Sequence, residues 1–159
     1  MTRNAAYDLI LDTLTPATGR AWHGGTTAVG AVSNVTAAEA HRRVAPGRKT
    51  IWELTLHIAY WKYAVRRHLE AEAIPRFPRS PSNWPAQPAA PDEAQWRADR
   101  ALLAEEDRLF QRAARRFDPA RLTRRPASKR KYTYGEMIAG VLAHDAYHTG
   151  QIQLLKRLP

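Results

Sequence analysis

The chain has 159 residues, 44% of them hydrophobic, and no cysteine, which excludes a disulfide framework, a thiolate metal ligand and a cysteine nucleophile. No apolar run approaches the roughly 18 residues of a membrane span, and residues 1–8 lack the apolar core of a signal peptide, so we expect one cytoplasmic domain over residues 1–159. The net charge of +10 is concentrated between Arg112 and Lys131, where nine basic residues accompany one acidic residue.

Residues 4–44 predict a helical arm that is broken by glycines. Residues 7–14 and residues 26–34 each have the composition of a short helix, and Gly19 and Gly24 lie in the interval between them. The sequence from Thr36 to Glu39 has the form of a capping box, in which a threonine and a glutamate three residues later satisfy the first N–H groups of a helix. A further short helix is therefore expected after Thr36.

The next helix is predicted with clear ends. Thr50 and Glu53 form a second capping box, which starts a helix at residue 51. An apolar stripe then recurs at helical spacing: Leu54, Ile58, Trp61, Val65 and Leu69. We expect a helix over residues 51–69 with its aromatic residues in the core.

Residues 74–91 form a long connection that contains six prolines, none of which could lie inside a helix without breaking it. Phe77, Asn83 and Trp84 are embedded among them. The connection, taken from residue 70 to residue 91, is long enough to return the chain along the whole preceding helix. The helix that follows is therefore predicted to run parallel to it.

Two more helices complete the chain. Asp92 is a candidate N-cap, and apolar residues spaced by seven predict a bundle seam that ends before Pro119: Trp96, Leu103, Phe110 and Phe117. A third capping box, from Thr133 to Glu136, starts a last helix that runs to about residue 157. Strand patterns are nearly absent. The predicted fold class is all-α, a bundle of four main helices with a long crossover between the second and the third.

Three histidines carry the chemistry that this sequence suggests. His144 and His148 are four residues apart and therefore project from one face of the last helix, on its apolar stripe. His57 lies between Leu54 and Trp61 on the apolar face of the second main helix. Three inward imidazoles from two helices predict an open site for one divalent metal ion. The alternative is three core histidines whose nitrogens are satisfied by hydrogen bonds.

The string His-Asp-x-x-His is close to the His-Glu-x-x-His motif of zinc peptidases, and we reject that interpretation. The aspartate is one carbon shorter than the glutamate that acts as base in those enzymes. Only 11 residues follow His148, and none of them is a histidine or an acid. The third ligand must therefore come from earlier in the chain, which suits His57.

Other polar residues have weaker support. Gln151 could orient a ligand, and Asp145 could hold the second nitrogen of a histidine, although a solvated carboxylate is the ordinary expectation for it. Glu106 could point inward as a base. His23 could lie near the open end of the bundle, although a loop histidine is the ordinary expectation for it. His41 and His68 have charged or exposed neighbours, which indicate no role in the site.

Residues 50–61 and 143–152 resemble the second and the last helix of DinB-like proteins. The resemblance extends over most of residues 20–157. It implies a four-helix bundle with a long crossover, often dimeric, and a three-histidine site for zinc, nickel or a similar ion, matched here by His57, His144 and His148. Some members of that family transfer groups to low-molecular-weight thiols or isomerise substrates with their help.

Two functions follow as hypotheses. The first is a metal-dependent enzyme, a transferase that uses a low-molecular-weight thiol or a hydrolase, acting on a small-molecule substrate as a homodimer. The second is a metal-stabilised bundle without catalysis, which binds nucleic acid or another polyanion through its Arg-rich loop. The basic stretch lacks interleaved aromatic residues before Tyr132 and Tyr134, so it is expected to be mainly a solvated surface, and nucleic acid is the less favoured partner.

Overall fold

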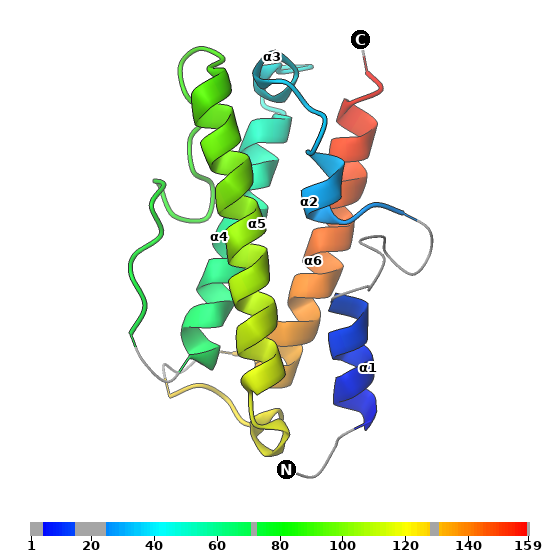
Figure 1. The fold of residues 1–159 in the computed structure, drawn as a ribbon, viewed down its shortest axis with the longest axis vertical. Coiled ribbons are helices and arrows are strands. Elements are labelled where there is room, and N and C mark those ends of the chain that lie inside the picture. Colours follow the sequence, from blue (N-terminus) through cyan, green and yellow to red (C-terminus); the bar gives the residue numbers. More distant parts are fainter. Residues whose placement is uncertain (1–4, 15–24, 71–72, 128–130, 159) are drawn as a thin grey trace.

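The computed structural model describes residues 5–14, 25–70, 73–127 and 131–158. Every regular element in these ranges is a helix, which confirms the all-α class, and three long helices dominate the fold (Figure 1). They are α4 (Ile51–Leu69), α5 (Glu93–Arg116) and α6 (Tyr134–Leu155). No helix within the described ranges is long and apolar enough to cross a membrane.

The long helices begin where their capping residues predict. In α4 the Thr50 side chain accepts from the Glu53 N–H, and the Glu53 carboxylate accepts from the Thr50 N–H. The same reciprocal pair, made by Thr133 and Glu136, opens α6. Asp92 caps α5 through its side chain. These contacts satisfy N–H groups that have no partner within the helix, and so they fix the first residue of each helix.

The helices α4 and α5 run in the same direction, whereas α6 runs against them. Contacts between α4 and α5 advance together along both helices, from Trp52 beside Asp99 to Lys62 beside Asp107. Residues 73–92 therefore return the chain along the outside of the bundle, as Figure 1 shows. His57 of α4 contacts His148 of α6, and Lys62 contacts Asp145, so the positions on α6 decrease as those on α4 increase.

Two short helices together occupy the fourth helix position of the bundle. The helices α1 (Ala5–Leu14) and α2 (Ala28–Ala31) each contact both α5 and α6, and Figure 1 shows them one beyond the other along α6. The Tyr7 hydroxyl anchors α1 by donating to the Ala114 carbonyl at 2.6 Å. A third short helix, α3 (Ala37–His41), starts at the predicted capping box. The predicted arm is therefore broken between α2 and α3, whereas the interval that contains Gly19 and Gly24 lies outside the described residues.

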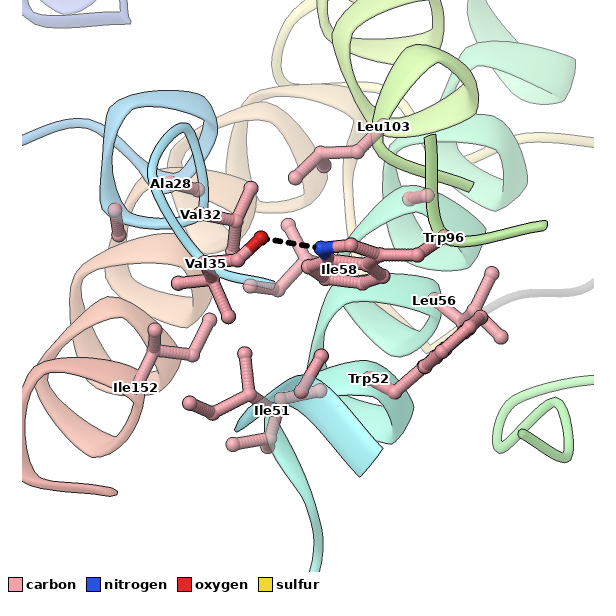
Figure 2. Close-up of a cluster of buried hydrophobic side chains, with 14 of the residues drawn as sticks. Ala28, Val32, Val35, Ile51, Trp52, Leu56, Ile58, Trp96, Leu103 and Ile152 are labelled. Carbon is pink, nitrogen blue, oxygen red and sulfur yellow. Dashed lines mark hydrogen bonds between the residues drawn. The ribbon is translucent and has the colours of Figure 1, made fainter. Parts of the chain in front are cut away.

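The core near α2 and α3 is built around two tryptophans (Figure 2). The rings of Trp52 and Trp96, both fully buried, lie 5.0 Å apart between centroids. The Trp96 indole N–H donates to the Val35 carbonyl at 2.6 Å, the dashed line in Figure 2. This bond ties the segment before α3 to α5, because a buried indole N–H needs an acceptor.

A buried carboxylate joins α4, α5 and the crossover. Asp99, which is 1% exposed, accepts from the Trp52 indole at 2.9 Å and from the Arg79 guanidinium at 2.7 Å. Each of its oxygens therefore has a partner from a different part of the chain. This arrangement holds the crossover segment against the parallel pair of helices.

The basic stretch between residues 112 and 131 is mostly exposed where the structure describes it. The last turn of α5 and the short 3-10 helix η1 (Pro119–Arg121) carry exposed arginines. Arg121 lies 5.1 Å from the ring centroids of both Phe117 and Tyr134. Lys129 and Arg130 lie outside the described residues.

Replacing Asp99 with alanine should destabilise the fold by about 3 kcal/mol, because the buried Trp52 N–H would lose its acceptor and Arg79 its counterion. The measurement is urea unfolding followed by circular dichroism. Arg79→Ala is the control, because the Arg79 side chain is partly exposed and its removal should lower the free energy of unfolding by a smaller amount. Equal losses from the two variants would contradict the central role of the carboxylate.

A second prediction concerns pH. Burial raises the pKa of Tyr7 to about 12, so the folded protein keeps this phenol protonated where the unfolded chain, with a pKa near 10, ionises it. The stability that Tyr7 contributes should be complete below pH 10 and lost as the pH rises from 10 to 12. Tyr7→Phe should flatten this part of the curve of unfolding free energy against pH. An unchanged slope in the variant would contradict the assignment.

Candidate metal centre

The three predicted histidines meet between α4 and α6. The Nε2 atoms of His57 and His144 lie 3.0 Å apart, and one nitrogen from each of the three rings lies within 4.8 Å of the others. The ring centroids are 4.4 to 4.9 Å apart. His57 and His148 are buried, and His144 is partly exposed.

In His57 and His148, a hydrogen bond on the outer side of the ring determines which nitrogen keeps a free lone pair for a metal ion. The Nδ1 of His57 lies 2.5 Å from the Asn83 backbone carbonyl, and the Nδ1 of His148 lies 2.6 Å from the Gln151 side-chain oxygen. Both oxygens can only accept, so each Nδ1 carries the proton. The lone pairs of both rings are then on Nε2, the atom that points into the cluster in His57.

The crossover segment closes the outer side of His57. The Trp84 ring stacks on the imidazole at 3.6 Å, with only 5° between the planes. Asn83 also accepts from the Trp61 indole N–H at 2.9 Å through its side chain. Its φ of 72° lies in the left-handed region, which asparagine tolerates better than most residues. The contacts of Asn83 and Trp84 with His57 are not predictable from a proline-rich stretch of sequence, which carries no local signal for them.

Two expectations about neighbouring residues were wrong. Trp61 was assigned to the core, yet it is 38% exposed and lies against His57 and His144. Asp145 was expected to be solvated. One of its oxygens instead pairs with the buried ammonium of Lys62, which also binds Asp107 at 2.6 Å.

The side of His144 away from the cluster contains two unsatisfied atoms. Within the described residues, the His144 Nδ1 and the Asp145 Oδ1 are both buried without a hydrogen-bond partner. They lie 3.9 Å apart, so a small rotation would bring them into contact. Metal-binding histidines commonly donate their second N–H to a carboxylate, and this pair is placed for such a bond.

Burial favours the neutral form, which metals require, in two rings of the cluster, His57 and His148. Desolvation lowers the pKa of His57 to about 4, against the opposing effect of the Asn83 carbonyl, and the two neighbouring histidines lower it further. Burial also lowers the pKa of His148, although the Gln151 bond acts the other way. Near pH 7 both imidazoles therefore have a free lone pair without first losing a proton.

Two cavities reach the histidines along the groove between α4 and α6. A cavity of about 360 Å³ is lined by His144 together with Trp61 and Met137. A cavity of about 770 Å³ is lined by His148 together with Trp84 and Gln151. His68, which was expected to have no role, also lines the smaller one.

Neither Glu106 nor His41 joins the cluster. Glu106 points inward as expected, but Arg66 holds its carboxylate with three hydrogen bonds of 2.9 to 3.1 Å. Burial raises the pKa of Glu106, and the guanidinium opposes the rise. The His41 Nε2 lies 2.9 Å from the Pro88 carbonyl, and His23 lies outside the described residues.

The donor set fits a divalent ion. Two nitrogens bound tetrahedrally to one zinc at about 2.1 Å lie about 3.4 Å apart, so small rotations of these rings would suffice. Imidazole suits zinc and nickel, and three protein ligands leave a coordination position open. Among the described residues this is the one group of metal-ligating side chains that lie close enough to share an ion.

The fold and the cluster define a class: helical bundles with a histidine site able to hold a metal ion. Comparison with protein families agrees, because the model of the DinB superfamily matches residues 24–152. The chain therefore belongs to the DinB superfamily. Searches of curated proteins and of solved structures each found no match.

Gln151 should support metal binding through His148. Gln151→Leu removes the acceptor at Nδ1 and should weaken metal affinity about 10- to 100-fold, the usual cost of losing such a partner. The measurement is competition with a metal-binding dye. Gln153→Leu is the matched control on the same helix and should leave the affinity unchanged. Equal effects of the two changes would contradict the role given to Gln151.

Proposed function

We propose that this protein is a metal-dependent enzyme in which His57, His144 and His148 hold one divalent ion, zinc or nickel. The reaction is the transfer of a small-molecule group to or from a low-molecular-weight thiol, with hydrolysis as the neighbouring possibility in the same class of site. The observation that supports the proposal is the convergence of three imidazoles, two of them held with Nε2 unprotonated.

A divalent ion in this site would supply Lewis acidity, lowering the pKa of a thiol or water to near neutrality. The protein orients its own rings: the Asn83 carbonyl fixes His57, and Gln151 fixes His148. Trp61 and Trp84 cover the imidazoles and limit the approach of water. In the transfer, a carbon–sulfur bond forms, the leaving group departs with its electron pair, and the thiol proton passes to solvent.

The chain has no cysteine, so the thiol must be part of a separate molecule. We also expect the enzyme to act in the cytoplasm as a homodimer.

Polyanion binding by the basic stretch is the second candidate. It is less favoured because Arg121 packs on two rings and the exposed arginines have few aromatic neighbours for stacking bases. Duplex binding that is steeply weakened by salt, and abolished by neutralising Arg124 and Arg125, would favour it.

Replacing His148 with alanine should reduce bound metal from about one ion per chain to near zero while helix content persists, because two remaining imidazoles bind weakly. The measurements are elemental analysis and circular dichroism after loading with zinc or nickel. His41→Ala is the control, since that ring lies on the Pro88 carbonyl outside the cluster.

Activity is then tested with the loaded parent protein, small electrophiles and several cellular thiols. Turnover that His148→Ala abolishes and His41→Ala retains is the expected result. Metal retained by a variant that lacks all three histidines would refute the site. If the metal-loaded protein shows neither thiol-dependent turnover nor hydrolysis, the proposed enzymatic function is refuted.

A further inference from the structure

The two cavities beside the histidines differ in chemical character. The smaller one has walls of Trp61, Val65, Met137 and Val141, and its acidic residue is Glu136. The Glu136 carboxylate serves the N-terminus of α6, where the Thr133 N–H donates to it at 2.7 Å and lowers its pKa. Among the residues that the structure describes, no lysine or arginine lines this cavity, and its mainly apolar walls suit an uncharged apolar molecule.

The larger cavity combines an apolar wall with two cations. Leu54 and Leu155 form part of the wall, and Arg48 and Lys49 line the same space, with no acidic residue among the described lining residues. The Lys49 ammonium lies 4.6 Å above the Trp84 ring and 3.3 Å from a Glu53 oxygen. Arg48 is exposed and carries a guanidinium group, which presents a cation and several N–H donors. This cavity suits an amphipathic anion.

The histidine cluster lies between the two spaces. His144 lines the smaller cavity and His148 lines the larger one, and no described residue lines both. The two cavities therefore have separate walls over the part of the chain that the structure describes. Both ligands would nevertheless reach the same group of imidazoles, whose nitrogens lie within 4.8 Å of one another.

We propose that the site binds two ligands together: an apolar molecule beside His144 and a carboxylate-bearing thiol beside His148. The carboxylates of the thiol face Arg48 and Lys49, and its sulfur points toward the histidines. This inference rests on the proposed function and specifies where each of the two reactants binds.

The smaller cavity can be filled without disturbing the core. A side chain added at Gly140, which lines this cavity, meets no atom within 4 Å of its Cβ, and a helix favours other residues over glycine. Gly140→Phe should therefore fold and occupy the apolar space. Gly150→Phe is the matched control, because Gly150 lies on the same helix, has equal room and lines neither cavity.

The charge of the larger cavity is tested by a paired neutralisation. Arg48→Gln combined with Lys49→Gln removes two positive charges from its lining. Arg112→Gln combined with Arg116→Gln removes the same charge from the exposed surface of α5, outside both cavities. The comparison separates a local contact from the general attraction of a basic protein for anions.

The experiment is equilibrium binding to zinc-loaded protein. The apolar probe is N-phenyl-1-naphthylamine, followed by fluorescence. The thiol probes are mercaptosuccinate, glutathione and 3-mercaptopropionate, with uncharged 2-mercaptoethanol for comparison, followed by calorimetry. We expect the naphthylamine and the anionic thiols to bind without competition.

Gly140→Phe should weaken the naphthylamine at least tenfold and leave the thiols unchanged. The Arg48/Lys49 pair should weaken the anionic thiols about tenfold, as expected for two partly exposed charge contacts, with no effect on the naphthylamine. Both controls should behave like the parent protein.

Two outcomes would overturn the inference. One is mutual exclusion of the two probe types. The other is that none of the anionic thiols binds more tightly than 2-mercaptoethanol. These outcomes can be distinguished from a failure of the proposed enzymatic function. Joint binding of the two probes without turnover would refute only the proposed reaction. Turnover together with competitive binding would refute only the two-ligand arrangement.

Discussion

The structure depends on one constraint: three imidazoles lie together between two helices, and each buried ring nitrogen needs a partner. For two of the three rings, His57 and His148, the fold supplies the partner of the outward nitrogen from different sources. A backbone carbonyl of the crossover takes the Nδ1 proton of His57, and a glutamine one turn further along α6 takes that of His148. Because the outward nitrogens are occupied, two Nε2 lone pairs remain available, and the cluster has the chemistry of a ligand set rather than of an ordinary core.

The topology explains how the crossover reaches the site. Parallel packing of α4 and α5 requires a connection that spans the length of the bundle, and a short turn could not provide one. That connection passes His57, where it places Asn83 and Trp84 against the ring. Asp99 holds the same segment through Arg79. The parallel arrangement thus both builds the bundle and supplies the outer wall of the candidate metal centre.

Sequence patterns predicted the helices because their signals are local. Capping residues mark the starts of α4, α5 and α6, and the four-residue spacing of His144 and His148 places both on one face of a helix. Contacts made by tertiary packing were not predictable in this way. The role of Asn83 depends on where a proline-rich segment passes over α4, and the pairing of Asp145 depends on a lysine more than 80 residues away.

The ionic contacts beside the cluster also bear on its charge. Burial favours the neutral amine of Lys62, but Asp145 and Asp107 outweigh it and raise its pKa, so one ammonium faces two carboxylates. This group carries one net negative charge directly beside His144. Three neutral imidazoles would leave a divalent ion with its full charge, and the adjacent group would offset only half of it. A centre of this kind keeps a net attraction for anions. The cavity beside His148 agrees with this, because its described lining residues include two cations, Arg48 and Lys49, and no acid.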